Sequence, residues 1–382
     1  SWSHKITRKL QAVNSCNKLR DVKVREMMRR GEMRMGKGLI KDVLARLTAK
    51  EDLTTEEIYG LIEAIRNDEL SDTQIAGFQV ALLMKGPSLA EITAIAAAMR
   101  DNCIRIDPDV DEELMDTCGT GGGLSTFNIS TAVAFVAAAA GIPVAKHGSR
   151  SISSLSGSAD VLEALGVEIN QSPGGVEKLI EDVGIAFLYA PLFHPVMCKV
   201  LPTEKDLGIK TIFYTVIGPL INPSRASRHV LGVYKPDLLD TVTHVAASIG
   251  YKRALFVHGL DGLDEISLLG KTRINELDNG SITAYEIEPE DFGLERCSLK
   301  DIATGTPQEN AAMINDVFSG RDKGPRRTAV VLNAAGALMV GGRAGSFREG
   351  IGLAGELIDS GEAQKKLKRL VEASHEYRCL YS

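Results

Sequence analysis

The sequence is poor in aromatic residues, which make up 5% of its 382 residues and include a single tryptophan. Glycine and aliphatic residues are abundant instead. This balance suits an α/β core better than an all-β core or a surface that stacks nucleobases. The sequence therefore favours an α/β protein.

Paired cysteines and long apolar runs are also missing. The six cysteines are scattered with no CxxC pair and no metal-ligand spacing: Cys16, Cys103, Cys118, Cys198, Cys297 and Cys379. We therefore expect free thiols in a reducing, cytoplasmic setting. The longest apolar run, residues 132–145, is broken by Gly141 and Pro143 and is too short to span a bilayer, so no membrane partner is expected.

The net charge of −6 is unevenly distributed. Residues 1–37 hold eleven Lys or Arg and three acids, a net of +8, so the remaining residues carry −14. We interpret 1–37 as a basic N-terminal extension. No apolar segment follows it, so a secretory signal is not expected, whereas organellar targeting and nucleic-acid contact stay open but are not favoured.

Two domains are predicted from the change in pattern near residue 103. Residues 38–102 form successive amphipathic segments opened by Ser, Thr or Asp, and predict a small helical domain with a return segment near 193–208. From 103 to 382, short apolar segments alternate with helical ones. We expect strands at 142–148, 185–190, 253–259 and 328–333, in a mainly parallel sheet flanked by helices, with an antiparallel insertion at about 264–300.

A glycine-rich stretch, GTGGGLSTFNIST, spans Gly119 to Thr131 and precedes an alanine-rich helix. A simple turn needs one or two glycines, whereas a loop whose amides surround a phosphate needs several. Asn128, Ser130 or Thr131 stands at the start of the following helix, where free N–H groups attract anions. The stretch is neither a P-loop nor a GxGxxG motif.

Two further segments carry similar chemistry. Lys146 and His147 end a predicted strand, and a hydroxyl-rich loop then leads to a helix start at Ser158. Asp264 and Glu265 follow another predicted strand, and adjacent carboxylates beside phosphates suit Mg²⁺. Each segment alone has a plainer explanation: a turn, a structural histidine or a surface acid pair. Together they favour an enzyme that handles a phosphorylated, Mg²⁺-bound small molecule.

At these residues the sequence resembles the anthranilate phosphoribosyltransferase family, in the class that includes pyrimidine nucleoside phosphorylases. The resemblance covers about residues 38 to 370. It is carried by GTGG (119–122), NIST (128–131), KHG (146–148), SGSADVLEALG (156–166), FHP (193–195), IGPLINP (217–223), LGVY (231–234), VHGLDGLDE (257–265) and LNAAGAL (332–338).

The resemblance implies a homodimer formed through the helical domains and phosphoribosyl pyrophosphate (PRPP) as donor. It implies donor contacts from Gly119, Thr120, Gly121, Gly122, Gly123, Thr126, Asn128, Ser130, Thr131, Lys146, Ser154 and Ser158. Ser130, Asp264 and Glu265 would bind Mg²⁺, and Lys146 and His147 are the candidate catalytic residues. Acceptor contacts would come from Gly119, His147, Ser149, Glu204, Tyr214 and Pro219.

The implied reaction displaces pyrophosphate at the anomeric carbon by an aromatic amine, as in tryptophan biosynthesis. The sugar carbon becomes oxocarbenium-like, so the leaving group needs stabilisation by Mg²⁺, Lys146 and helix N-termini. An arylamine is already nucleophilic, so positioning supplies much of the remaining catalysis.

This chain departs from the family pattern mainly at the acceptor end. Gly123 and Leu124 follow GTGG where the family has Asp-Gly, and the loop is one residue shorter. Ser149 replaces an Asn, Lys210 an Arg and Tyr214 an Asn. Glu204 stands where the family has an Arg that faces the anthranilate carboxylate, with Lys205 next to it.

Replacing a cation by Glu204 opposite a carboxylate would turn attraction into repulsion. The alternatives to anthranilate transfer are therefore a paralogue with another acceptor, a nucleic-acid-binding paralogue without transferase activity, and a nucleoside phosphorylase.

Overall fold

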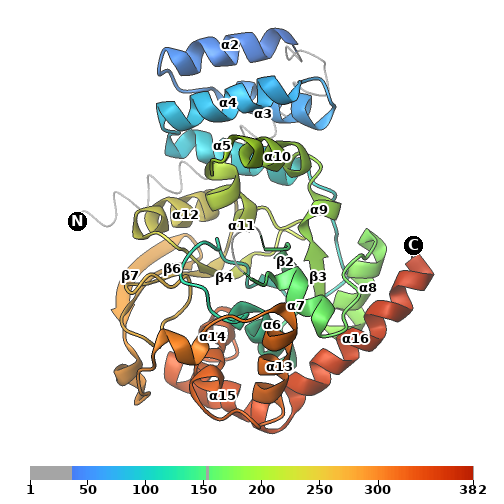
Figure 1. Cartoon of the computed structure of the whole chain (residues 1–382), viewed down its shortest axis with the longest axis vertical. Coiled ribbons are helices and arrows are strands. Elements are labelled where there is room, and N and C mark those ends of the chain that lie inside the picture. Colours follow the sequence, from blue (N-terminus) through green and yellow to red (C-terminus); the bar gives the residue numbers. More distant parts are fainter. Residues whose placement is uncertain (1–36, 152–154, 382) are drawn as a thin grey trace.

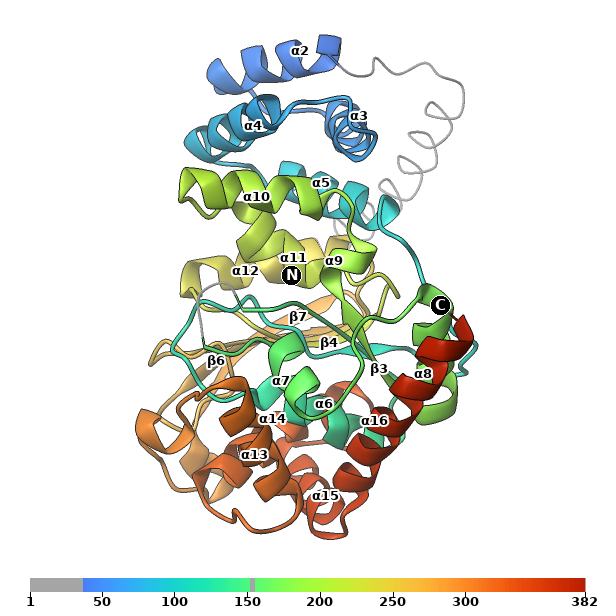
Figure 2. The same ribbon diagram turned by 45° about the vertical axis from the view of Figure 1, so that its right-hand side comes forward.

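The computed structural model describes residues 37–151 and 155–381. The basic extension predicted at 1–37, apart from Lys37, and the donor contact predicted at Ser154 lie outside these described residues. Figures 1 and 2 show a helical layer stacked on a larger α/β body. No helix in the described ranges is long and apolar enough to cross a membrane.

The helical layer consists of α2 (Lys37–Thr48), α3 (Thr55–Arg66), α4 (Asp72–Lys85) and α5 (Leu89–Asp101), and α10 (Met197–Leu207) returns to pack on α4. Thr54, Ser71 and Ser88 are the N-caps of α3, α4 and α5, and each forms a capping box with the acid or amide three residues later. These caps satisfy the first free amides of each helix and fix where it begins.

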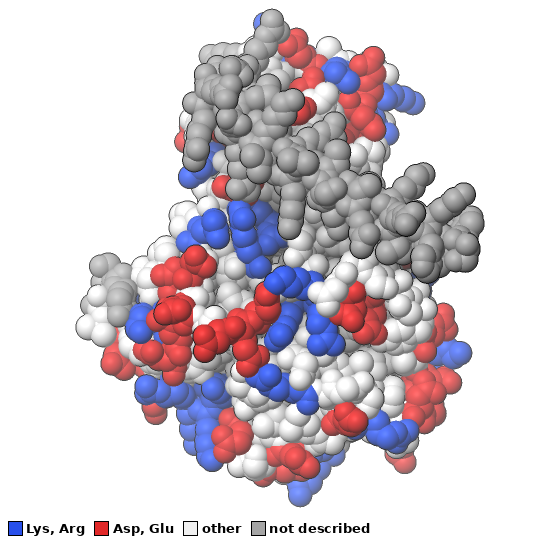
Figure 3. All heavy atoms as spheres, turned by 180° about the vertical axis from the view of Figure 1, so that it is seen from behind, with Lys and Arg blue, Asp and Glu red and all other residues white. Residues whose placement is uncertain are grey.

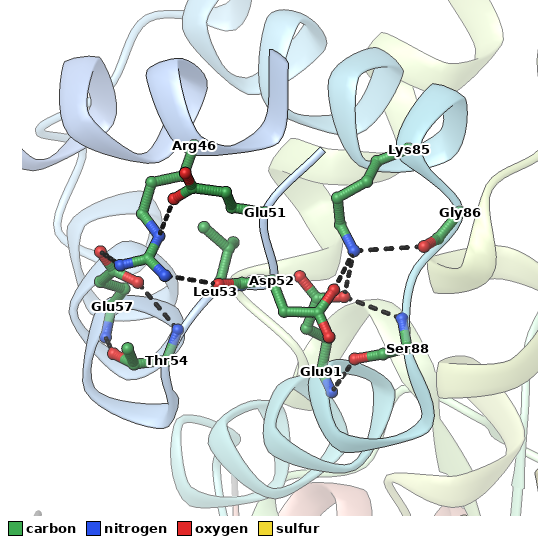
Figure 4. A network of polar contacts seen from close by, with 10 residues as sticks. All are labelled: Arg46, Glu51, Asp52, Leu53, Thr54, Glu57, Lys85, Gly86, Ser88 and Glu91. Atoms are coloured by element: carbon green, nitrogen blue, oxygen red, sulfur yellow. Dashed lines mark hydrogen bonds and ion pairs between the residues drawn. The ribbon is translucent and has the colours of Figure 1, made fainter. Parts of the chain in front are cut away.

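A lysine with a buried side chain joins α4, α5 and the segment that precedes α3 (Figure 4). The Lys85 ammonium lies 2.5 Å from Asp52 Oδ1 and 2.7 Å from Glu91 Oε2, and it also donates to the Gly86 carbonyl. Glu91 accepts from the backbone N–H of Leu53 with its other oxygen, at 2.9 Å. Because the charges and lone pairs of Lys85 and Glu91 find partners, the group tolerates burial and links the end of α4 and the start of α5 to the segment before α3.

The α/β body contains a seven-stranded sheet of order β3-β2-β1-β4-β5-β6-β7. Five strands are parallel, and β6 and β7 form an antiparallel hairpin at one edge. The strands are β1 (Met115–Asp116), β2 (Val144–Gly148), β3 (Ile185–Tyr189), β4 (Arg228–Gly232), β5 (Arg253–Gly259), β6 (Thr272–Asp278) and β7 (Ser281–Ile287). The mainly parallel sheet and its antiparallel insertion agree with the sequence analysis.

Helices cover both faces of the sheet (Figure 2). One face packs against α12 (Pro236–Ser248) and shares a hydrophobic core with the helical layer. The other face packs against α6 (Ile129–Ala139) and α14 (Pro325–Val340), in a second core. The remaining helices are α7 (Ser158–Ala164), α8 (Pro173–Val183), α9 (Ala190–Phe193), α11 (Gly218–Leu220), α13 (Pro307–Phe318), α15 (Phe347–Asp359) and α16 (Glu362–Tyr381). Short 3₁₀ turns span Pro289–Phe292 and Leu299–Ile302, and a π-helical turn spans Phe213–Ile217.

The strand predicted at 328–333 is wrong, because these residues lie inside α14. The helix is buried continuously from Ala329 to Leu338, so it lacks the polar face that normally reveals a helix. From sequence alone, a short apolar helical segment that is buried on all sides cannot be distinguished from a buried strand. The helical residues continue without a break to Val340, and such a length is typical of a helix rather than of a strand.

Candidate active site

The parallel strands direct their carboxyl ends toward one cavity of about 1130 Å³. The chain moves outward from β1 to β2 and β3, then returns to the other side of β1 as β4. Open parallel sheets bind ligands at such a reversal of strand order. Residues at or directly after the carboxyl ends of β1, β2, β3 and β4, together with the loop after β5, line this cavity.

The glycine loop after β1 is held open by its backbone. Gly121 and Gly122 have φ angles of 62° and 93°, in the region that favours glycine. The Thr120 amide donates to the Gly232 carbonyl at 2.9 Å, and its hydroxyl accepts from the Tyr234 amide at 3.0 Å. Gly119, Thr120, Gly121, Gly122, Gly123 and Thr126 all line the cavity, as expected of a loop that surrounds an anion.

The α6 N-terminus reaches the cavity beside this loop. Asn128 is the N-cap of α6, but its side chain forms no capping bond and instead contacts Ser156 and Asn310. The first α6 amides therefore lack a side-chain cap. Those of Ile129 and Thr131 donate to the backbone carbonyls of Phe127 and Asn128, and the partial positive charge of the helix N-terminus lies beside the cavity. Ser130 lines the cavity, whereas Thr131 is fully buried behind it and is not part of the cavity wall.

Asp264 and Glu265 face the cavity from the loop after β5. Burial raises the pKa of both carboxyls, and the neighbouring Asp264 charge contributes to raising the Glu265 pKa to about 8. The backbone amides of Gly121 and Ser130 donate to Asp264 and Glu265, respectively. Two half-buried acids side by side favour a bound cation, and their oxygens are ligands that Mg²⁺ uses together with water and ligand phosphate. The described residues hold no cluster of three or more His, Cys, Asp or Glu that could form a closed metal cage.

Lys146 brings a positive charge into the same space. Its ammonium is buried and donates to the Thr117 hydroxyl at 3.1 Å. Burial lowers its pKa, against the opposing effect of the nearby acids, which include Asp116 and Glu265. Lys146 can therefore interact with the oxygens of a phosphorylated ligand.

Asp116 positions the residues around Lys146. Its Oδ1 accepts from the amides of Thr117, Cys118 and His147 at 2.7 to 3.1 Å, and its Oδ2 accepts from Asn222 at 2.7 Å. A carboxylate saturated with donors is a rigid connector. Asp116 thus joins the ends of β1 and β2 to the loop at Asn222.

His147 is paired with His194, a residue that sequence reasoning placed in a family motif but not in the site. Their Nε2 atoms lie 3.0 Å apart, and both rings are buried in the cavity wall. Burial lowers the pKa of His147 to about 4 and that of His194 well below its usual value. At neutral pH the pair is uncharged, with one ring donating to the other.

The carboxyl group of Asp160 connects two parts of the loop after β2. Asp160 accepts from the amides of Ser151 and Gly157 at 3.0 and 2.8 Å. Arg150 lines the cavity but is already paired with Glu163 at 2.6 and 2.8 Å and with Asp160 at 3.0 Å. The predicted residues Ser149 and Ser158 both line the cavity in this loop.

The end of the cavity where the sequence analysis expects the acceptor is formed by α10 and the π-helical turn. Tyr214 and Pro219 line the cavity as expected, and so do Lys205 and Lys210. Glu204 does not: it is only 3% exposed and its carboxyl group bonds to Gln79 and Thr211. The expectation that Glu204 faces the acceptor is therefore not met, because successive helical residues point about 100° apart and residue 204 falls on the α4 side.

Signals for the missed residues were partly present in the sequence. His194 belongs to the FHP motif, which follows an apolar segment of the sequence. In α10, the helical period points the side chains of Glu204 and Lys205 in different directions. The role of Asp116 depends on His147 and Asn222, which lie 31 and 106 residues further along the chain and which a single sequence does not pair.

The comparisons with known proteins agree with this geometry. Residues 41–103 match the helical bundle domain of a glycosyl transferase family, and residues 111–364 match its a/b domain. An anthranilate phosphoribosyltransferase of Acetivibrio thermocellus is 47% identical over 340 residues, covering 89% of this chain and 98% of the relative. That of Methanobrevibacter smithii is 46% identical over 335 residues, covering 87% and 99%.

Solved structures show the same architecture. The anthranilate phosphoribosyltransferase of Thermus thermophilus superposes with a TM-score of 0.81 at 40% identity, covering 87% of this chain and 99% of that one. The Saccharomyces cerevisiae enzyme in complex with PRPP and Mg also gives 0.81, at 29% identity, covering 90% and 99%. The site, the fold and these relatives lead to one conclusion: the chain belongs to the anthranilate phosphoribosyltransferase family of glycosyl transferases.

Proposed function

We propose that the protein transfers the phosphoribosyl group of PRPP to anthranilate in a Mg²⁺-dependent reaction. The observation that carries the proposal is the convergence of three groups on one cavity: the glycine loop, the uncapped α6 N-terminus and the Asp264–Glu265 pair. The relatives are named for this reaction, and a yeast relative is described in complex with PRPP and Mg.

In this proposal, different residues bind the donor and the acceptor. The loop from Gly119 to Gly123 and the positive end of the α6 dipole would hold the pyrophosphate, and Lys146 would stabilise charge that develops on it. Ser130, Asp264 and Glu265 would hold Mg²⁺, which when bound neutralises the leaving group. As the C–O bond to pyrophosphate breaks, the anomeric carbon becomes electrophilic and the amine nitrogen forms the new C–N bond. Pyrophosphate leaves with the C–O bonding electrons, and the amine gives up one N–H proton to pyrophosphate or to solvent.

The neutral His147–His194 pair suits the acceptor end of this reaction. Uncharged buried rings can lie against an aromatic amine without adding charge next to the forming cation. Ser149, Tyr214 and Pro219 complete the wall at this end in the proposal, with Gly119 between the two ends.

The other functions weighed from the sequence are less well supported. A paralogue without activity would not need two half-buried acids side by side at an open cavity, because their mutual repulsion and partial desolvation cost stability. Nucleic-acid binding needs an extended basic surface, whereas Figure 3 shows acidic and basic patches interspersed on the described part of one face. A nucleoside phosphorylase is disfavoured by relatives named for anthranilate transfer.

We further propose that two copies associate through the helical layer. Val80, Leu83 and Met84 on α4 are 39%, 42% and 78% exposed, and Leu89 at the start of α5 is 46% exposed. Positions 80, 83 and 84 share one helical face, so they form a patch rather than scattered residues. A second copy of the same patch is the simplest partner for a self-complementary apolar surface.

Binding of the donor tests the metal and phosphate half of the proposal. We expect PRPP to bind in a Mg²⁺-dependent manner by titration calorimetry, and Asp264→Asn to weaken this binding by about tenfold or more. Glu295→Gln, an exposed acid outside the cavity, is the matched control and should bind normally. Donor binding that survives both chelation of Mg²⁺ and Asp264→Asn would contradict the assignment.

A further inference from the structure

We propose that Asn333 in α14 is a positioning residue for the proposed metal-binding pair, Asp264 and Glu265. It acts through the backbone of the adjacent residue, Ile266, and so sets the direction from which the Glu265 carboxyl group faces the cavity. The inference rests on the proposed Mg²⁺-dependent binding of PRPP and adds a residue to that function from a distant helix.

The side-chain amide of Asn333 is occupied by backbone groups. Its Oδ1 accepts from the Ile266 N–H at 2.8 Å, and its Nδ2 donates to the Ile266 carbonyl at 2.9 Å. The second Nδ2 hydrogen goes to the Ala329 carbonyl, one turn earlier in α14, at 3.0 Å. Because Asn333 is only 2% exposed, water does not compete for these bonds, and they hold Ile266 firmly against α14.

The bond to the Ile266 N–H restrains the main chain of Glu265. That N–H belongs to the peptide unit that joins Glu265 to Ile266, and a peptide unit is planar. Fixing this plane therefore limits the rotation of the Glu265 backbone. The Ser130 amide donates to the Glu265 carboxyl group from the other side. Glu265 is thus held at its main chain by α14 and at its carboxyl group by the start of α6.

Gly336 lets α14 approach closely enough for this contact. Asn333 and Gly336 are three residues apart and lie on the same face of the helix. A Cβ at residue 336 would lie 3.0 Å from Ile266 Cδ1 and 3.1 Å from Leu255 Cδ1. α14 therefore contacts Ile266 twice, with Asn333 on its backbone and Gly336 beside its side chain. Both residues belong to the LNAAGAL segment (332–338), which carries part of the family resemblance.

Other hydrogen bonds close the loop after β5 on itself. The Asp261 carboxyl group accepts from the Leu263 N–H at 3.1 Å and from the Ser267 hydroxyl at 2.5 Å. The Thr272 hydroxyl accepts from the Ser267 N–H at 2.8 Å. Asn333 instead ties the loop to another element. Such placement matters because Mg²⁺ tolerates little deviation from octahedral geometry, and groups that orient metal ligands change affinity by about 10- to 100-fold when they are removed.

The test measures how much Mg²⁺ each variant needs in order to bind the donor. PRPP is titrated by calorimetry, at a series of Mg²⁺ concentrations, into the wild type, Asn333→Ala and Asn275→Ala. Asn275 in β6 is a matched control: it is also 2% exposed and donates to Asp240 and Thr243, but it lies outside the cavity. Both variants lose buried hydrogen bonds, so a general loss of stability affects both.

We expect Asn333→Ala to raise the Mg²⁺ concentration for half-maximal donor binding about tenfold or more, and excess Mg²⁺ to restore the binding. Asn275→Ala should stay within about twofold of the wild type. A rise of similar size in both variants would overturn the inference, as would a loss of PRPP affinity that saturating Mg²⁺ does not reverse.

Gly336→Ala covers the case in which Asn333→Ala does not fold, because it keeps the Asn333 amide and displaces the Ile266 side chain. It should raise the Mg²⁺ requirement in the same direction by a smaller factor, and in that case an unchanged requirement overturns the inference. No acceptor is present, so the result is independent of which amine reacts. A wild-type protein that binds no PRPP, or binds it without Mg²⁺, would refute the proposed function itself, and the inference would fall with it.

Discussion

Glu204 combines a buried position with a carboxyl group that has no cationic partner in the described structure. Burial raises its pKa above the usual 4.5, although the bonds from Thr211 and Gln79 oppose the rise. A carboxyl whose pKa is higher in the folded protein binds its proton more tightly there. The stability it contributes is therefore present at low pH and is lost as the pH rises above about 4.5 through the folded-state pKa.

Glu204→Gln is expected to remove this pH dependence, because a neutral amide can still accept from Gln79 and Thr211. At pH 8 the variant should be at least as stable as the wild type, and the two should converge toward pH 4. Thermal unfolding across this range measures the difference. A marked loss of stability for Glu204→Gln at pH 8 would contradict this account of Glu204 and its hydrogen bonds.

A second variant, Glu204→Arg, restores the residue type that the family has at this position. It buries a cation beside neutral groups, so we expect it to lose roughly 3 kcal/mol or more of stability. Lys205→Arg, on the exposed side of the helix, should unfold like the wild type. A stable Glu204→Arg protein with a lower KM for anthranilate would show that α10 presents residue 204 to the acceptor.

The shortened glycine loop is adapted to glycine at position 123. A Cβ there would lie 2.7 Å from the Gly262 carbonyl oxygen and 3.1 Å from Asp264 Oδ1. Restoring the family's acid by Gly123→Asp would force the loop apart and place a third acidic side chain next to Asp264 and Glu265. We expect a loss of about 1–3 kcal/mol in stability and weaker donor binding.

Chemical unfolding and PRPP titration of Gly123→Asp test this, with Gly352→Ala in α15 as control. A Cβ at residue 352 meets nothing within 4 Å, so that variant should be neutral or up to about 1 kcal/mol more stable. Normal stability and tighter donor binding in Gly123→Asp would mean that the loop has room for the acid.

Elements with a clear local signal could be predicted from the sequence. The strand at 253–259 matches β5, and the capped helices of the N-terminal layer begin at Ser or Thr residues as expected. The signal failed where burial removes the polar face, as in α14, and where a strand is too short to show a period, as in the two-residue β1. Burial on all sides hides the difference between helix and strand.

Which residues line the cavity could be predicted better at its proposed donor end than at its proposed acceptor end. Glycine, hydroxyl and acid residues at strand ends are read from local sequence, because the parallel sheet brings those ends together. The side chain of Glu204 depends on Gln79, which is 125 residues away, and the π-helical turn shifts the residues beside Tyr214. Such long-range partners are set by packing rather than by local pattern.

The proposed homodimer gives the apolar α4 surface a testable role. Met84→Glu places a charge at the most exposed position of the patch, so it should weaken self-association without disturbing the core. Light scattering coupled to gel filtration should show a dimer for the wild type and more monomer for the variant. Leu380→Glu changes an exposed leucine near the C-terminus, away from the patch, and should stay dimeric. A wild-type protein that is monomeric at micromolar concentration would refute the proposal.

The most direct test of the account is release of pyrophosphate from PRPP by the purified chain with Mg²⁺ and anthranilate. We predict release that needs all three components and forms one phosphoribosyl-anthranilate for each pyrophosphate. Release with another arylamine but not with anthranilate would contradict the proposed acceptor while keeping the donor site. No release with any arylamine, in a folded protein that binds Mg²⁺ and PRPP, would contradict transferase function itself.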